Sequence, residues 1–506
     1  MASIGLVAAL WLELVLAPPA GEPDPGDAER ESAWEAAGWG SPAPTPAPEP
    51  TPEPEPQPEP EQPTSESDVI EIVAAELPSP TREPAAEPEP DWSAWDTPST
   101  HDAEQTKDKL RVGDVLSGSL RLTGSFLHYD DVPELFPAGD DALALIVGRV
   151  LLEADAGKHV HFTFNGFGEL SRSPSGSGIG GSFASAGSTS SAYRTRFLVW
   201  NFWQSGAIGG QLGVDRAAIR LNFDSVRIEL GRFPITYAVT GMLTTNDFFA
   251  PFSATTVNRI YKPGVDAARI SVGLTPRASV DVLGVLGYDP SNDRPSWART
   301  AVFTRAAFVG AGFEWALLGG KVSQRWVAGG SLQGDAGPVS LRAEFHVGIP
   351  DAEGDGHDRS DRPVYGRVAA GPSMNFAWHN AMVSAEYLYA SDGAATPSGY
   401  VDRALASYSD DLPYLGRHHV ALATSMELLP ILRVALTGLL CASDGSGLAG
   451  VSFLYNVADE SDLILGVFVP WGKGLRGIDM VTMQPQLGSE FGLAPISAYL
   501  EARVFF

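Results

Sequence analysis

From about residue 113 onward, the chain consists mostly of segments of roughly ten residues in which apolar and polar side chains alternate. Successive side chains of a β-strand point to opposite faces, so each segment has one apolar and one polar face. The clearest segment is 339–347, where every second residue from Val339 is apolar and the residues between are Ser340, Arg342, Glu344 and His346. The pattern predicts a series of antiparallel strands.

The apolar content favours a membrane barrel. Apolar residues make up 44% of the chain, yet after residue 20 no apolar run is long enough for a transmembrane helix. Without such helices, only a closed barrel satisfies every backbone hydrogen bond in lipid. Tight turns at 155–157, 224–225, 334–337 and 459–461 alternate with long connections at 171–192, 232–262, 350–362, 392–415 and 472–492. Residues 110–506 are therefore predicted to form an all-β transmembrane barrel of about 16–18 strands, and a further strand at 193–203 would change that number.

The N-terminal region differs from the rest. Residues 1–20 have the apolar stretch and small-residue exit of a secretory signal peptide, but no basic residue precedes the stretch and Glu13 interrupts it. Either the signal is atypical or the true start is not Met1. Residues 21–109 form a Pro/Glu-rich segment, for which disorder in the periplasm is expected. A spacer or cell-wall tether and a tail without a partner are both compatible with it.

Charge and cysteine usage narrow the function classes. Of the 62 acidic and 34 basic residues, 24 and 4 lie in residues 1–109, so this region carries −20 of the net charge of −28. The nearly balanced remainder argues against a nucleic-acid partner. The one cysteine, Cys441, excludes an internal disulfide and a zinc site built from cysteines. No convergent catalytic set stands out, and no enzyme activity, metal or cofactor is expected.

In the C-terminal strand, two faces of different polarity alternate along the chain up to the last residue. Glu501 and Arg503 lie on one face, and the opposite face carries Leu500, Ala502, Val504 and Phe506. This ending resembles the signal that outer-membrane proteins present to the barrel-assembly machinery. The resemblance implies that the protein is a Gram-negative outer-membrane protein surrounded by lipid.

A second resemblance lies in residues 215–269. A strand at 215–221 is followed by a returning strand at 226–232, which ends in Gly231-Arg232. A long loop comes next, and the strand after it begins with Pro263-Gly264-Val265-Asp266. This order resembles large outer-membrane porins, in particular the broad group that includes phosphate-selective and alginate-export channels. The resemblance implies that loop 233–262 folds into the lumen and narrows it, and it is compatible with a homotrimer. The long Pro/Glu tail departs from those porins, and the loop has too few cations for a phosphate assignment.

Charged residues of this stretch are the candidates for the pore constriction, because charges at the narrowest point decide which solutes pass. An alternative is that they are ordinary lumen residues in mutual ion pairs. The predicted function is passive diffusion of small hydrophilic solutes, and the alternative is a structural or adhesive barrel with a closed lumen, tethered to the cell wall by its tail. The candidates are Arg216, Arg220, Arg227, Glu229, Arg232, Asp247, Arg259, Lys262 and Asp266.

Overall fold

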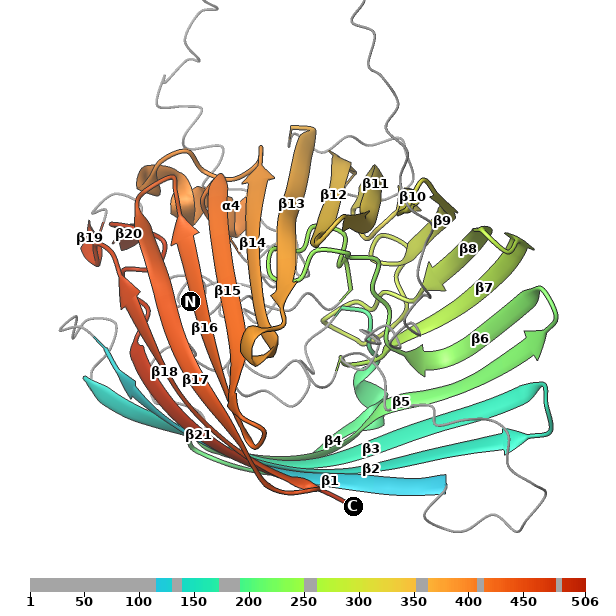
Figure 1. The fold of residues 1–506 in the computed structure, drawn as a ribbon, viewed down its shortest axis with the longest axis horizontal. Helices are drawn as coiled ribbons and strands as arrows, with labels where there is room; N and C mark the ends of the chain where they lie inside the picture. Colours follow the sequence, from blue (N-terminus) through green and yellow to red (C-terminus); the bar gives the residue numbers. More distant parts are fainter. Residues whose placement is uncertain are drawn as a thin grey trace, which may run out of the picture. The chain divides into compact units, whose positions relative to one another are not determined.

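The computed structural model describes residues 115–129, 139–172, 192–249, 262–351, 363–406, 414–478 and 485–506. Within these ranges, 18 antiparallel strands form one closed ring, following one another around it in chain order (Figure 1). The strands are β1 (Leu116–His128), β2 (Asp140–Ala156), β3 (Val160–Arg172), β5 (Ile208–Phe223), β6 (Val226–Phe233), β7 (Val265–Thr275), β8 (Ala278–Val285), β9 (Ala301–Gly310), β10 (Phe313–Lys321), β11 (Arg325–Ala336), β12 (Val339–Pro350), β13 (Tyr365–Phe376), β14 (Ala381–Ala390), β15 (His418–Leu429), β16 (Leu432–Cys441), β17 (Ser446–Ala458), β18 (Ser461–Trp471) and β21 (Ile496–Phe505).

The first and last strands close the ring. β21 pairs with β18 on one edge and with β1 on the other, where Ser119 lies opposite Phe505. The backbone of Phe506 continues this pairing, since its N–H donates to the Gly118 carbonyl at 3.0 Å and its carbonyl accepts from the Gly118 N–H at 2.6 Å. Closure leaves the ring without a free edge, which confirms the predicted barrel.

A short additional strand, β4 (Val199–Ser205), lies in the region where the sequence left a further strand open. It pairs with the first residues of β5, beyond the end of β6. Because it is not part of the ring, the number of barrel strands stays at 18, the upper value predicted from the turns. The predicted tight turns each fall where two paired strands meet.

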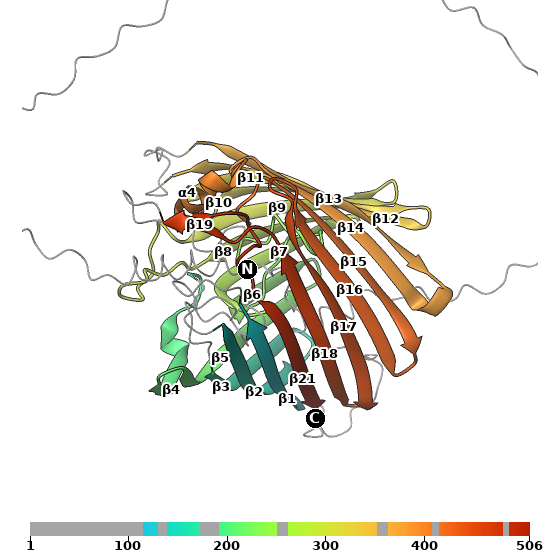
Figure 2. The same cartoon turned by 90° about the vertical axis from the view of Figure 1, so that its left-hand side faces the viewer.

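The two faces of the strands differ as the alternation predicts. On β12, Phe345 and Val347 are exposed on the outer face, whereas Glu344 and His346 are buried on the inner face. Figure 2 shows β12–β18 running side by side as long slanted strands, the arrangement expected of a membrane barrel. The outer face is an apolar belt suited to lipid, and the inner face is polar.

Short elements lie between the strands. In the long connections they are η3 (Arg196–Leu198), η5 (Pro397–Gly399), α4 (Tyr400–Ala406) and the two-stranded ribbon of β19 (Leu475–Ile478) and β20 (Pro485–Leu487), and η4 (Trp378–Asn380) forms the short turn between β13 and β14. In the described ranges, no helix is both long and apolar enough to span a membrane. Residues 1–109, Arg259 and most of the loops at 171–192 and 350–362 fall outside the described residues, so the predictions made for them stay predictions.

Candidate channel constriction

The segment that follows β6, residues 234–249, enters the barrel and reaches strands further around the ring. In Figure 1 it is the green trace inside the ring, near β12 and β14. Glu344 of β12 accepts hydrogen bonds from the backbone N–H groups of Val239, Thr240, Thr245 and Asn246. Glu386 of β14 accepts those of Gly241, Met242 and Leu243. The inward course implied by the porin resemblance is thus confirmed for the described residues of the loop.

Apolar side chains hold the same segment on two sides. Phe248 and Phe249 pack against Phe303 of β9, with ring centroids 6.2 and 5.8 Å apart. Met242 and Leu243 belong to a second cluster, formed with inner-face residues of β13–β18 and β21. The segment therefore spans the lumen between two apolar contacts, with the two glutamates between them. This geometry narrows the passage, because the segment occupies space that solutes would otherwise use.

Gly231-Arg232 and Val265-Asp266 form a clamp. It lies where the segment leaves the barrel wall and rejoins it. Arg232 is 1% exposed, and its guanidinium donates to both carboxylate oxygens of Asp266, at 2.6 and 2.9 Å. It also donates to the carbonyls of Val214 at 2.8 Å and Thr195 at 3.1 Å. Gly231 has φ of 121°, a conformation that other residues rarely adopt, and a Cβ there would lie 2.2 Å from a neighbouring carbonyl oxygen. The structure thus places Arg232 and Asp266 in a buried pair at the base of the segment.

The other predicted candidates lie on the inner wall and at the returning end of the segment. Glu229 is buried and pairs with both Arg220, at 3.0 Å, and Arg269. Arg227 is exposed, and its Nε donates to the Asn222 side chain at 3.2 Å. Near the segment, Lys262 pairs with Asp247 at 2.5 Å and its carbonyl accepts from Arg216 at 3.1 Å. All the candidates within the described residues are in contact with one another or lie on adjoining strands.

Within several wall pairs, the cation is the more exposed partner. The Arg220 side chain is 37% exposed against 4% for Glu229, and that of Arg121 is 25% exposed against 3% for its partner Glu501. Arg149 is likewise more exposed than its partner Asp215. The order is reversed where Arg305 meets Glu314. In the pairs of Arg121, Arg149, Arg220 and Arg269 the guanidinium is thus the more exposed group, whereas in the buried clamp Arg232 is less exposed than Asp266.

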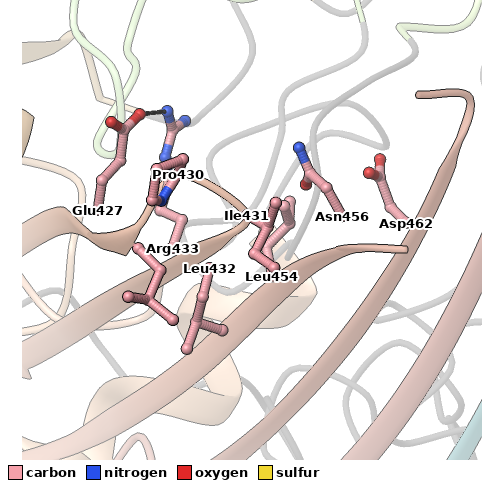
Figure 3. Close-up of a pocket in the computed structure, with 9 residues that line it drawn as sticks. Glu427, Pro430, Ile431, Leu432, Arg433, Leu454, Asn456 and Asp462 are labelled. Carbon is pink, nitrogen blue, oxygen red and sulfur yellow. Dashed lines mark hydrogen bonds and ion pairs between the residues drawn. The ribbon is translucent and has the colours of Figure 1, made fainter. Parts of the chain in front are cut away.

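A pocket of about 250 Å³ lies away from the inward segment, beside the short turns that end β15 and β17 (Figure 3). Arg433 donates to Glu427 at 2.6 Å, and Asn456 and Asp462 complete the polar side of the pocket. One cation between two acids gives this pocket no clear preference for either sign of charge. None of its lining residues belongs to segment 234–249 or to the predicted constriction candidates.

The sequence missed the residues that hold the segment in place. Alternation identifies Glu344 and Glu386 as inner-face residues, but Arg342, two residues from Glu344, shows the same pattern and has no contact with the segment among the described interactions. Arg121, Arg149 and Arg269 were missed for a similar reason. Their position on the inner face is predictable, whereas their exposure relative to a partner is not.

Known proteins similar to this chain are found among solved structures, at low sequence identity. No family model matches the chain, and no curated protein matches it. Among solved structures, it is similar to Pseudomonas aeruginosa OccK11 (OpdR), with 9% identity, a TM-score of 0.45, and coverage of 77% of this chain and 96% of that one. It is also similar to P. aeruginosa OccK2 (OpdF) in complex with glucuronate, with 12% identity, a TM-score of 0.44 and coverage of 77% and 98%. A third similar structure is P. aeruginosa OpdK with vanillate, with 10% identity, a TM-score of 0.44, and coverage of 77% of this chain and 98% of that one. None of these names indicates a phosphate-selective or alginate-export channel, so that part of the resemblance stays a prediction.

Proposed function

We propose that the protein is an outer-membrane porin through which small hydrophilic solutes diffuse passively. The observation that carries this proposal is the closed barrel with an apolar outer face and a polar lumen, into which segment 234–249 projects. A barrel of this kind gives solutes a water-filled path through lipid, and the constriction selects them by size and charge. Transport would follow the concentration gradient.

We further propose that the lumen prefers anions. The guanidinium groups of Arg220, Arg269 and Arg121 lie nearer to the lumen than the carboxylates that pair with them. A buried carboxylate with an exposed cationic partner gives a positive local potential at the wall, even though the pair is neutral. An anion passing this wall exchanges part of its hydration for guanidinium N–H groups, which bind carboxylates and phosphates in a fork-like geometry. Arg227 adds an exposed charge without an acidic partner among its described contacts.

The expected surroundings of the porin also belong to this proposal. The apolar positions of β21, from Leu500 to Phe506, would be recognised by the barrel-assembly machinery. Residues 1–20 would direct export, and residues 21–109 would form an acidic segment in the periplasm. A homotrimer would be compatible with the apolar outer face.

Single-channel recording tests the function directly. We expect the full-length protein, purified in detergent and inserted into planar bilayers, to open steadily in a potassium chloride gradient. The reversal potential should have the sign of a chloride preference. A folded protein that never conducts would contradict the porin and favour the structural or adhesive barrel. A reversal potential of the opposite sign would keep the porin and remove the anion preference.

Changing two exposed arginines should weaken the anion preference. In the double variant Arg227→Glu and Arg220→Gln, the wall loses three units of positive charge. One unit at about 8 Å in water is worth about 0.5 kcal/mol, so three units cost an anion about 1.5 kcal/mol and favour a cation, and the anion-to-cation permeability ratio should fall at least about tenfold at low salt. The measurement is the reversal potential in the same gradient. Lys158→Glu, in the exposed turn after β2, is the control and should leave the ratio unchanged. Equal reversal potentials for the double variant and the wild type would remove Arg220 and Arg227 from the constriction.

A further inference from the structure

Three side chains of different chemistry meet at the long-connection end of the barrel. His419 lies at the start of β15, Cys441 is the last residue of β16, and Glu490 lies between β20 and β21. Their nitrogen, sulfur and oxygen atoms all lie within 4.8 Å of one another, and His419 Nε2 is 2.9 Å from Glu490 Oε2. All three residues are fully buried. Three potential metal ligands thus converge in a place that excludes water.

The surrounding backbone fixes Glu490 in this place. Its carboxylate accepts the N–H groups of Leu415 at 3.0 Å and Gly416 at 2.8 Å, and its own N–H donates to Asp444 at 2.7 Å. A Cβ at Gly416 would lie 2.4 Å from the sulfur of Cys441 and 3.0 Å from a carboxylate oxygen of Glu490. Only glycine lets this backbone approach both groups so closely. The carboxylate of Glu490 is therefore held by contacts outside the cluster.

The donor atoms of the cluster suit a transition-metal cation. The Nδ1 atom of His419 has no hydrogen-bond partner among the described residues. The Tyr400 hydroxyl lies 3.5 Å from the Cys441 sulfur and donates to Asp444 at 2.7 Å. Thiolate, imidazole and carboxylate are the ligands that zinc takes in proteins, whereas magnesium and calcium take oxygen ligands.

We propose that His419, Cys441 and Glu490 bind a zinc ion that fastens the connection before β21 to β15 and β16. On binding, a zinc–sulfur bond forms and the thiol of Cys441 gives up its proton to solvent. The sequence argues against zinc because it offers one cysteine. The fold adds a histidine and a glutamate that lie far from Cys441 along the chain. This site goes beyond the proposed channel function and does not depend on it.

Cobalt is a suitable probe, because cobalt bound to a thiolate has a charge-transfer absorption band in the near ultraviolet. Cys441 is the only cysteine of the chain, so such a band can arise only from this residue. We expect full-length folded protein, stripped with a chelator, to develop the band with one cobalt ion per barrel. Zinc should then displace the cobalt and remove the band.

Two ligand variants and one matched control complete the test. Cys441→Ser should abolish the band, and His419→Gln should weaken cobalt binding by more than the roughly 10- to 100-fold that loss of an outer partner costs. His418→Gln is the control, because His418 is the adjacent residue but bonds to the Tyr387 hydroxyl at 2.7 Å outside the cluster. Its band should match that of the wild type. Folded wild-type protein that gives no thiolate band with excess cobalt, and that retains no zinc after refolding with zinc, would overturn the proposal. This result is independent of whether either ligand variant folds.

Discussion

Replacing Arg232 with methionine should destabilise the barrel by about 3–5 kcal/mol, because the buried carboxylate of Asp266 loses its paired cation. The carbonyls of Val214 and Thr195 lose a donor at the same time. A loss of this size is a large part of the roughly 5–15 kcal/mol by which folded proteins are stable. The measurement is the urea midpoint of unfolding of the refolded protein in detergent, together with the migration of unheated samples in gels.

Two further variants make this prediction specific. Arg227→Met changes an exposed arginine on the same strand, and we expect it to alter stability by no more than about 0.5 kcal/mol. The double variant Arg232→Met with Asp266→Leu removes both charges, so it should recover much of the lost stability. If the single variants at 227 and 232 unfold at the same urea concentration, Arg232 does not make the buried pair. In that case the prediction that Arg232 lines the constriction would be favoured.

Replacing both Glu344 and Glu386 with glutamine should release segment 234–249 from the wall. The two carboxylates together accept seven backbone N–H groups of the segment. Hydrogen bonds to a charged group contribute about 1.5–3 kcal/mol each, so loss of the two charges should cost the bound arrangement at least about 3 kcal/mol. A change of this size shifts the ratio of bound to released segment about 100-fold. Single-channel recordings should then show larger conductance and frequent transitions between current levels.

The control for this experiment is Glu314→Gln. Glu314 also lies on the inner wall, but its described partners are Arg305 and Gln333, neither of which belongs to the segment. We expect its channel to keep the conductance and the current noise of the wild type. Unchanged conductance and noise in the double variant would show that the apolar contacts of Phe248 and Phe249 hold the segment without the glutamates.

The sequence predicts the barrel well because membrane strands carry a local signal. Alternation between Ser340 and Val347 shows which side chains face lipid, and turn residues show where strands end, so the fold and a range of 16–18 strands could be obtained without any contact information. The course of the loop after Gly231-Arg232 came from a resemblance to porins. The physical reason for that motif, a glycine bend that lets Arg232 reach Asp266, became visible only in the structure.

The remaining features depend on contacts between distant parts of the chain. Nothing near Glu344 in the sequence indicates that its carboxylate faces the backbone of residues 239–246, because that meeting requires the loop to cross the barrel. The cluster of His419, Cys441 and Glu490 is a similar case, with ligands from three separate elements. Single-sequence patterns identify the face of a strand on which a residue lies, but they do not identify its partner across the lumen.

The pairing of β1 with β21 determines when the barrel can close. Arg121, near the start of the first strand, bonds to Glu501 of the last strand, 380 residues later. The first strand is exported early, but one of its edges has no partner until the end of the chain arrives. Loss of the last ten residues by premature termination or proteolysis would leave both β1 and β18 with an unpaired edge. A chain that lacks β21 therefore cannot close the barrel.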